Sequence, residues 1–222
     1  MFHPKHQLTY GDFELLGSQA FQESEDRLQE FRVPAFALYK GEQHLRLMEG
    51  IRGYEAQNGV ESVDLWVVSA GYGLISSRQE IVPYDCTFRG MGVTQIHTWA
   101  CHLGIPESAR QLLERRFDLM VILLGREYLQ ALALDNDVEL FSPTLFLASR
   151  TSKKHIAGIG KRRTVCVSSV DSQRFACGMI GLKGEIGKQL LRFLVEFGDD
   201  GLSRVFDQNT DVLDLLASDP EQ

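Results

Sequence analysis

With 222 residues, the chain is long enough for one large domain with a sizeable core. Its apolar share of 44% and charged share of 24% are typical of ordinary globular proteins. No apolar stretch approaches the roughly 20 residues that span a bilayer, and the first residues lack the apolar region of a secretory signal, so we expect no membrane partner. The four cysteines are scattered without a CxxC pair, which predicts reduced thiols and a cytoplasmic location.

Apolar periodicity along the chain predicts strands that alternate with amphipathic helices. In chain order, we expect helices at 21–31 and 43–54, a strand at 65–69, a helix at 107–116, a strand at 119–124, a helix at 126–134, strands at 145–148 and 164–168, and a helix at 183–197. This order is typical of an α/β protein. The prediction is a three-layer sandwich around a mainly parallel sheet of about four strands, in a single domain over 1–222.

The net charge of −7 is concentrated at the end of the chain. From about residue 196 onward, the chain contains eight Asp and Glu residues and a single basic residue, Arg204. The same acidic extension contains Phe206, Leu213 and Leu216 at spacings that a helix can bury. We expect a short docked helix ending near Ala217, with 218–222 disordered; the alternative is a mobile acidic segment that screens basic residues.

The segment 150–163 has the opposite charge, with six Lys and Arg and no acid. Such a cluster is a candidate phosphate-binding surface, although a solvated loop would have the same composition. Its candidate DNA-binding residues are Arg150, Lys153, Lys154, His155, Lys161, Arg162 and Arg163.

Residues 65–85, LWVVSAGYGLISSRQEIVPYD, form the main candidate active site. An apolar strand is followed by the polar, glycine-rich stretch 69–73. Open α/β sheets bind ligands in the crevice just outside the carboxyl ends of their strands. A hydroxyl, aromatic rings and a carboxylate gather here, namely Ser69, Gly71, Tyr72, Tyr84 and Asp85. The alternative is a glycine turn followed by a solvated Asp.

Two other strand ends supply further candidate substrate-binding residues. Gly125, Arg126 and Tyr128 follow the strand at 119–124, and a helix beginning at Arg126 offers free N–H groups to a phosphate. Ser168 and Asp171 follow the strand at 164–168.

Several cofactor motifs are absent from the sequence. Gly71 and Gly73 lack the third glycine and the immediate helix of a dinucleotide fingerprint, and the residues around Lys161 do not form a phosphate-binding P-loop. His97 and Cys101 lie four residues apart on a predicted helix. The paired ligand spacing of a closed zinc site is absent, so we expect these side chains to serve the packing of the helix. We expect no cofactor and no metal.

Three segments resemble a family catalogued as a domain of unknown function and similar to the peroxide-stress-protein group. They are PAFALYKGEQHLRLMEGI, DLWVVSAGYGLISSRQEIVPYD and DLMVILLGREYLQAL, between about Pro34 and Leu134. The family's core contains S-A-x-x-G-L followed by P-Y-D or P-Y-E, as at Ser69 and Pro83.

The order of strands also resembles the uracil-DNA-glycosylase-like fold. In that fold, the loop after the first core strand carries an Asp and an aromatic residue that stacks on the flipped base, and the last strand ends in a DNA-contacting loop. The resemblance places these loops at Leu65 to Asp85 and Val165 to Gln173. It is one of architecture, and glycosylases of this type that excise modified phage bases are the relatives it implies.

We therefore expect a DNA glycosylase that removes a modified or non-standard base, in repair or antiviral defence. Asp85 and Tyr84 are the predicted catalytic residues: Asp85 activates water or stabilises the sugar cation, and Tyr84 and Tyr72 flank the base. The base must leave the stack to reach them. The alternatives are a non-enzymatic DNA-binding stress or defence protein and an enzyme acting on free nucleosides or nucleotides.

Overall fold

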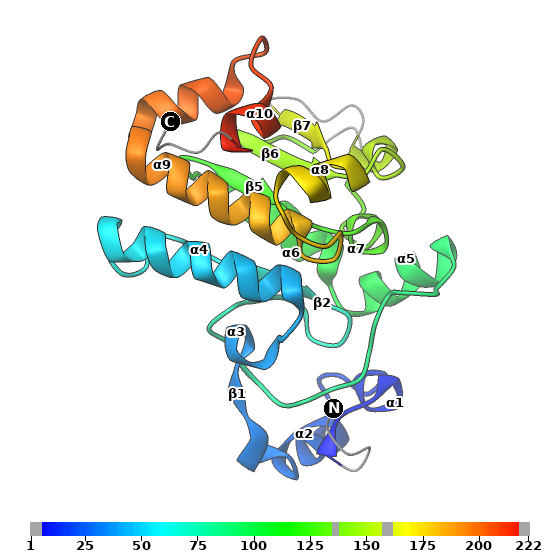
Figure 1. The fold of residues 1–222 in the computed structure, drawn as a ribbon. Coiled ribbons are helices and arrows are strands. Elements are labelled where there is room, and N and C mark those ends of the chain that lie inside the picture. Colours follow the sequence, from blue (N-terminus) through cyan, green and yellow to red (C-terminus); the bar gives the residue numbers. More distant parts are fainter. Residues whose placement is uncertain (1–5, 135–137, 157–161, 218–222) are drawn as a thin grey trace. The chain divides into compact units, whose positions relative to one another are not determined.

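The computed structural model describes residues 6–134, 138–156 and 162–217. The chain forms two compact units (Figure 1). Unit 1 contains Met1–Tyr39, Asp64–Leu112 and Glu127–Leu134, and unit 2 contains Lys40–Val63, Leu113–Arg126 and Asp135–Gln222. The single α/β domain expected over 1–222 stays a prediction.

Unit 1 combines short helices with two antiparallel strand pairs. Its elements are α1 (Tyr10–Phe13), α2 (Gln19–Asp26), η2 (Gln29–Phe31), β1 (Val33–Pro34), α3 (Ala35–Leu38), β2 (Trp66–Ser69), β3 (Gly73–Ser76), β4 (Glu80–Ile81), α5 (Val93–His102), most of α6 (Ile105–Leu113) and most of α7 (Arg126–Ala131). A core of Leu8, Phe13, Phe21, Leu28 and Val82 packs beneath α1 and α2.

The strand at 65–69 differs from its predicted role. β2 pairs antiparallel with β3, from Trp66 opposite Ser76 to Ser69 opposite Gly73. The chain turns back within three residues because Gly73 adopts a φ of +79°, which residues with a Cβ rarely do. The glycine-rich stretch is therefore a hairpin turn, and among the described residues the parallel sheet contains three strands.

Unit 2 holds this parallel sheet, in the order β5–β6–β7. Its elements are α4 (Glu42–Asn58), β5 (Met120–Ile122), β6 (Thr144–Ala148), η3 (Lys153–Ile156), β7 (Arg162–Cys166), α8 (Ser169–Arg174), α9 (Leu182–Phe206) and α10 (Val212–Ala217). The central strand β6 is buried along its whole length, as its unbroken apolar sequence predicts. Mixed helices and strands with a parallel sheet agree with the predicted α/β class.

Helices α4 and α9 lie side by side in unit 2 (Figure 1). Glycines allow the close approach, since a Cβ on Gly184 would lie 2.0 Å from the carbonyl oxygen of Gln43. The contact also buries charge. The Glu185 carboxylate lies 2.8 Å from the Arg46 guanidinium and 2.9 Å from the Lys188 ammonium. Burial alone would raise the pKa of Glu185, but hydrogen bonds from these two cations hold it below its ordinary value.

The acidic extension is largely helical. Its first residues belong to α9, which kinks at Gly198 where φ is +50°. After a turn, α10 packs three side chains into the core of unit 2, namely Val212, Leu213 and Leu216. The predicted docked helix that ends at Ala217 is confirmed, and 218–222 lie outside the described residues. No helix in the described part of the chain has the length and apolar character needed to cross a membrane.

Deleting residues 211–222 is expected to lower the melting temperature by several degrees, because it removes the buried face of α10. Leu216→Ala leaves the charge unchanged and should act in the same direction. Thermal unfolding measures both. If the truncated protein melts where the full-length protein does but binds random DNA more tightly, the segment acts by screening charge and not by packing.

Candidate active site

A buried chain of hydroxyl groups lies at the centre of unit 1. The Ser69 hydroxyl donates to the Tyr84 hydroxyl at 2.8 Å, and the Tyr84 and Tyr39 hydroxyls share a hydrogen bond of 2.6 Å. Ser69 also accepts hydrogen bonds from the backbone N–H groups of Gly71 and Tyr72 at the hairpin turn. The Ser69 side chain thus connects three segments, namely β2, the hairpin turn and the residues before Asp85.

Tyr72 has a separate partner within unit 1. Its hydroxyl donates to the Glu25 carboxylate at 2.9 Å and accepts the Val82 N–H at 3.3 Å. Arg32 lies 4.0 Å from the same carboxylate. Because its hydroxyl is held by α2 and by the backbone before Tyr84, Tyr72 is a framework residue and not one that flanks a base.

Burial raises the pKa of both Tyr72 and Tyr84 above the ordinary value for tyrosine. The charge of Glu25 adds to the shift at Tyr72, and Tyr39 adds to that at Tyr84. Both hydroxyls therefore keep their protons at neutral pH. Tyr84 can donate or relay a hydrogen bond, but it is not a base.

The glycine at the turn serves close packing. A Cβ on Gly71 would lie 2.6 Å from the ring of Phe13, and one on Gly73 would lie 2.7 Å from the carbonyl oxygen of Leu103. Both positions are filled by the protein's own side chains and backbone. The sequence placed Gly71 in a substrate pocket, whereas the structure places it in the core.

Asp85 differs from its neighbours because its side chain is exposed. The backbone on either side is clamped to the N-terminal segment: Leu8 N–H donates to the Pro83 carbonyl at 2.9 Å, and Asp85 N–H donates to the Leu8 carbonyl at 2.8 Å. The carboxylate itself lies 3.5 Å from the amide nitrogen of Gln7. A fixed backbone thus presents an accessible carboxylate one residue after the half-buried Tyr84.

Two further tyrosines contact Thr87, two residues after Asp85. Tyr10 accepts the Thr87 N–H at 2.7 Å and donates to the Thr87 carbonyl, and the Tyr128 hydroxyl lies 3.4 Å from the Thr87 hydroxyl. Burial raises the pKa of Tyr10, and the charges of Cys86, Tyr128 and Asp85 raise it further. Burial also raises the pKa of Cys86 to about 12, so this thiol is a poor nucleophile at neutral pH.

A hollow of about 380 Å³ opens beside this group in unit 1. The rings of Tyr10 and Trp99 meet edge to face at 5.5 Å on its wall, and the Trp99 indole N–H donates to the Ala70 carbonyl at 2.7 Å. The other lining residues are Glu14, Met91, Thr94, Gln95 and Thr98. The size lies within the range of small-ligand sites, and two aromatic rings with hydroxyl and amide groups suit a planar polar ring.

The residues at the other two strand ends have different surroundings. Gly125 and Arg126 are exposed and belong to unit 2, whereas Tyr128 belongs to unit 1. Ser168 and Asp171 form a helix cap: the Asp171 carboxylate accepts both the N–H and the hydroxyl of Ser168 at 2.8 Å. These two groups are occupied in capping the start of α8 and are not directed at a substrate.

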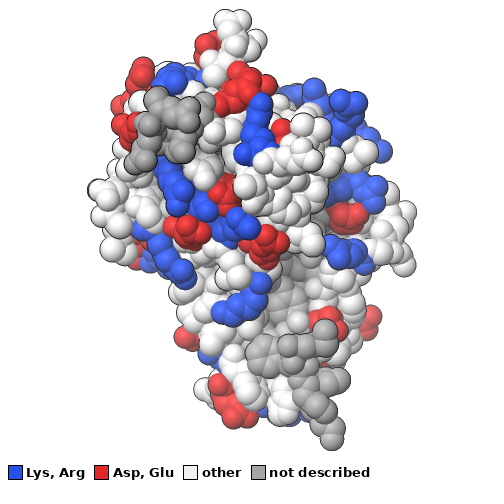
Figure 2. Space-filling model, in the orientation of Figure 1, with Lys and Arg blue, Asp and Glu red and all other residues white. Residues whose placement is uncertain are grey.

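Part of the basic segment 150–163 is exposed, as expected of a phosphate-binding surface. Arg150, Lys153 and Lys154 are exposed, the last two on η3. Figure 2 shows Lys and Arg gathered on the region that follows β6 at the upper right, whereas Asp and Glu intermingle with them over much of the remaining face. Burial and the charges of Lys154 and Arg126 lower the pKa of His155, so it is neutral at pH 7 and does not attract phosphate.

Arg162 and Arg163 lie on β7 and have different surroundings. The Arg163 guanidinium donates to the backbone carbonyls of Val205, Asp207 and Thr210, and thereby holds the turn between α9 and α10. Its guanidinium is therefore engaged within the protein and, contrary to the expectation from sequence, is not presented to DNA. Lys161 lies outside the described residues.

The structure adds Tyr10, Glu25 and Tyr39 to the residues expected at this site. Only Tyr39 had a sequence signal, because it ends the P-A-x-x-L-Y motif of the resembled family. On α5, the Cys101 sulfur lies 3.8 Å from the His97 ring nitrogen. No group of three or more His, Cys, Asp or Glu side chains suited to a metal occurs among the described residues.

Comparison with known proteins gives one match. A model described as a family of unknown function, DUF6884, matches residues 24–145, more than half of the chain. The matched part includes Glu25, Tyr39, Ser69, Tyr84 and Asp85. No curated protein and no solved structure matches.

Proposed function

The chain belongs to this family of unknown function, and we propose that it is an N-glycosidase that removes a modified or non-standard base from DNA. The observation that carries the proposal is Asp85, an exposed carboxylate on a clamped backbone whose charge acts on Tyr10, a wall residue of the aromatic hollow. The proposal also includes a resemblance of 34–134 to the peroxide-stress-protein group and a three-layer architecture like that of uracil-DNA glycosylases. It further includes a cytoplasmic location and a role in antiviral defence.

In the proposed reaction, Tyr10 and Trp99 hold the extruded base and Asp85 faces its sugar. The bond between C1′ and the base nitrogen breaks, and the electron pair leaves with the base. A water molecule adds its oxygen to C1′ and gives up a proton to Asp85, and that proton passes by way of solvent to the nitrogen of the departing base, which leaves the carboxylate regenerated. The carboxylate also stabilises the positive charge that grows on the sugar in the transition state. Tyr84, held by Ser69 and Tyr39, positions the backbone of Asp85.

A nucleoside N-glycosidase is the second candidate, and one observation favours it. The hollow lined by Tyr10 and Trp99 has no Lys or Arg among its lining residues, and its one charged lining residue is the acid Glu14. An uncharged free nucleoside would fit such a lining without a phosphate contact.

The test incubates the protein with plain DNA, with DNA rich in modified bases and with free nucleosides. We expect alkali-labile abasic sites and released base from modified DNA. Base release from nucleosides alone would establish the second candidate. Binding to DNA without any base release, at every substrate tried, would mean a non-enzymatic DNA-binding protein.

Salt dependence tests the basic surface separately. If Lys153 and Lys154 each contact a phosphate, replacing both with Gln should flatten the log–log slope of DNA affinity against salt by about 1.8. Both side chains are exposed, so the fold should be unaffected. The control exchanges two exposed cations of unit 2 away from this surface, Lys40→Gln with Arg52→Gln. Equal slopes in the two double variants would leave η3 as an ordinary solvated surface.

A further inference from the structure

The hollow in unit 1 is formed by one face of each of two helices, α1 and α5. Tyr10 and Glu14 lie one helical turn apart, since the Glu14 N–H donates to the Tyr10 carbonyl at 2.9 Å. The lining residues of α5 are spaced three or four positions apart, namely Thr94, Gln95, Thr98 and Trp99. The rings of Tyr10 and Trp99, with centroids 5.5 Å apart, join the two faces. The lining side chains of both helices therefore converge on one space.

The charge of this lining is acidic. Glu14 is its charged lining residue. Its side chain is exposed, and the part of the chain that the structure describes offers the carboxylate no hydrogen bond or ion pair. The pKa of Tyr10 is raised by burial and, in addition, by nearby charges that include Asp85, so a second carboxylate acts on the same wall. Aromatic faces also carry negative potential. Together these groups attract a positively charged ring.

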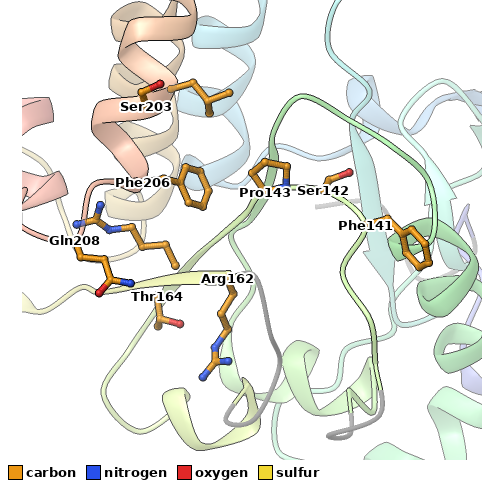
Figure 3. Close-up of a pocket in the computed structure, with 10 residues that line it drawn as sticks. Phe141, Ser142, Pro143, Arg162, Thr164, Ser203, Phe206 and Gln208 are labelled. Carbon is orange, nitrogen blue, oxygen red and sulfur yellow. The ribbon is translucent and has the colours of Figure 1, made fainter.

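A larger hollow in unit 2, of about 800 Å³, differs in both respects. Its charged lining residues are the cations Arg162 and Arg163. Figure 3 shows that Arg162 and Thr164 project from the side of β7 opposite to Phe206 and Gln208, so these side chains do not face a common space. A converging, acidic and aromatic lining is thus the property of the hollow in unit 1.

The lining of the unit 1 hollow is poorly suited to donating a proton to a departing base. Among the lining residues, Tyr10 carries the ionisable hydroxyl, but this hydroxyl donates to the Thr87 carbonyl and its pKa is raised by burial. A base that is already positively charged needs no such proton. When the bond from C1′ to its nitrogen breaks, the electron pair neutralises the ring. Water adds its oxygen to C1′, and the released proton passes by way of Asp85 to solvent.

We propose that the base removed at this site is a positively charged, N-alkylated purine, whose ring lies against Tyr10 and Trp99 with its charge near Glu14. The inference rests on the proposed glycosidase function and names its substrate class. 7-Methylguanine and 3-methyladenine carry this charge while they are attached to deoxyribose. Unmodified purines are neutral, so the charge distinguishes the substrate from the rest of the DNA.

Base release from different DNAs tests the substrate class. One DNA is methylated with dimethyl sulfate, and the others contain uracil or hypoxanthine as neutral modified bases; spontaneous loss in buffer is subtracted. We expect methylated purines to be released at least about tenfold faster than either neutral base, and Glu14→Gln to remove most of this advantage. The matched control Glu30→Gln removes the same charge from an exposed position of unit 1 and should leave the advantage unchanged.

A binding measurement separates this inference from the glycosidase proposal. Calorimetric titration compares 1-methyladenosine, which is positively charged at neutral pH, with adenosine. We expect the charged nucleoside to bind roughly tenfold more tightly, and Glu14→Gln but not Glu30→Gln to reduce the difference. Melting temperatures verify the fold of both variants.

The two proposals fail in different ways. Release of neutral bases without release of methylated purines overturns this inference and leaves the glycosidase proposal standing. Absence of release from every DNA refutes the glycosidase proposal, and the titration alone then decides whether the hollow selects a cation. Equal affinity for the two nucleosides, or equal effects of Glu14→Gln and Glu30→Gln, overturns the inference.

Discussion

Asp85→Asn is expected to lower the rate of base release by on the order of 100-fold or more, with the fold intact. The substitution keeps the size of the side chain and removes its charge. An amide can neither take the proton of an attacking water nor stabilise a cation on the sugar. The side chain is exposed and lies 3.5 Å from its nearest hydrogen-bonding group, Gln7, so its loss should cost little stability. Single-turnover base release measures the effect.

Glu80→Gln is the matched control for this prediction. Glu80 is also an exposed carboxylate of unit 1, on the short strand β4, and its change should leave the rate within about twofold. A second comparison uses Tyr84→Phe, which keeps the buried ring but removes the hydroxyl that Ser69 and Tyr39 share. Near wild-type base release by Asp85→Asn would refute the catalytic assignment, whatever Tyr84→Phe does.

The helices and the parallel strands could be predicted because their signals are local. The apolar runs at 119–124, 145–148 and 164–168 overlap β5, β6 and β7, and the periodicity at 43–54 lies within α4. Periodicity reports which face of an element is apolar. It therefore located the elements without showing what each one packs against.

The pairing of β2 could not be predicted from the same signal. A short apolar run is equally compatible with a parallel strand and with one arm of a hairpin. Gly71 and Gly73 marked a turn, but a glycine that permits ligand approach and one that permits packing look identical in sequence. Contact with Phe13, 58 positions before Gly71 in the chain, decides between them.

The candidate site was predicted in part for a related reason. Asp85 is exposed and clamped, as a reactive carboxylate should be. Tyr72 and Tyr84 follow the same motif, yet their hydroxyls face Glu25 and Ser69 inside the unit. Which way an aromatic ring points depends on partners distant in sequence. Arg163 of β7 likewise holds the turn between α9 and α10, a role that its charge alone could not indicate.

Gly184→Ala is expected to have the largest effect on stability. The added Cβ would lie 2.0 Å from the carbonyl oxygen of Gln43, and 2.8 Å from its carbonyl carbon, both of which belong to the backbone of α4. Backbone atoms cannot rotate away, so the two helices must separate. Separation would also stretch the ion pair that Glu185 of α9 makes with Arg46 of α4. We expect a loss of about 2–3 kcal/mol and a fall in melting temperature of roughly 5–10 °C.

Gly53→Ala provides the opposite expectation on the neighbouring helix. Gly53 lies in the interior of α4, is exposed, and an added Cβ there meets no atom within 4 Å. Alanine should therefore stabilise the protein by about 0.5–1 kcal/mol, because it restricts the unfolded chain and favours the helix. Denaturant unfolding of both variants gives the two free energies. Equal changes at Gly184 and Gly53 would mean that helix propensity, and not the close contact of α4 with α9, determines what these glycines contribute.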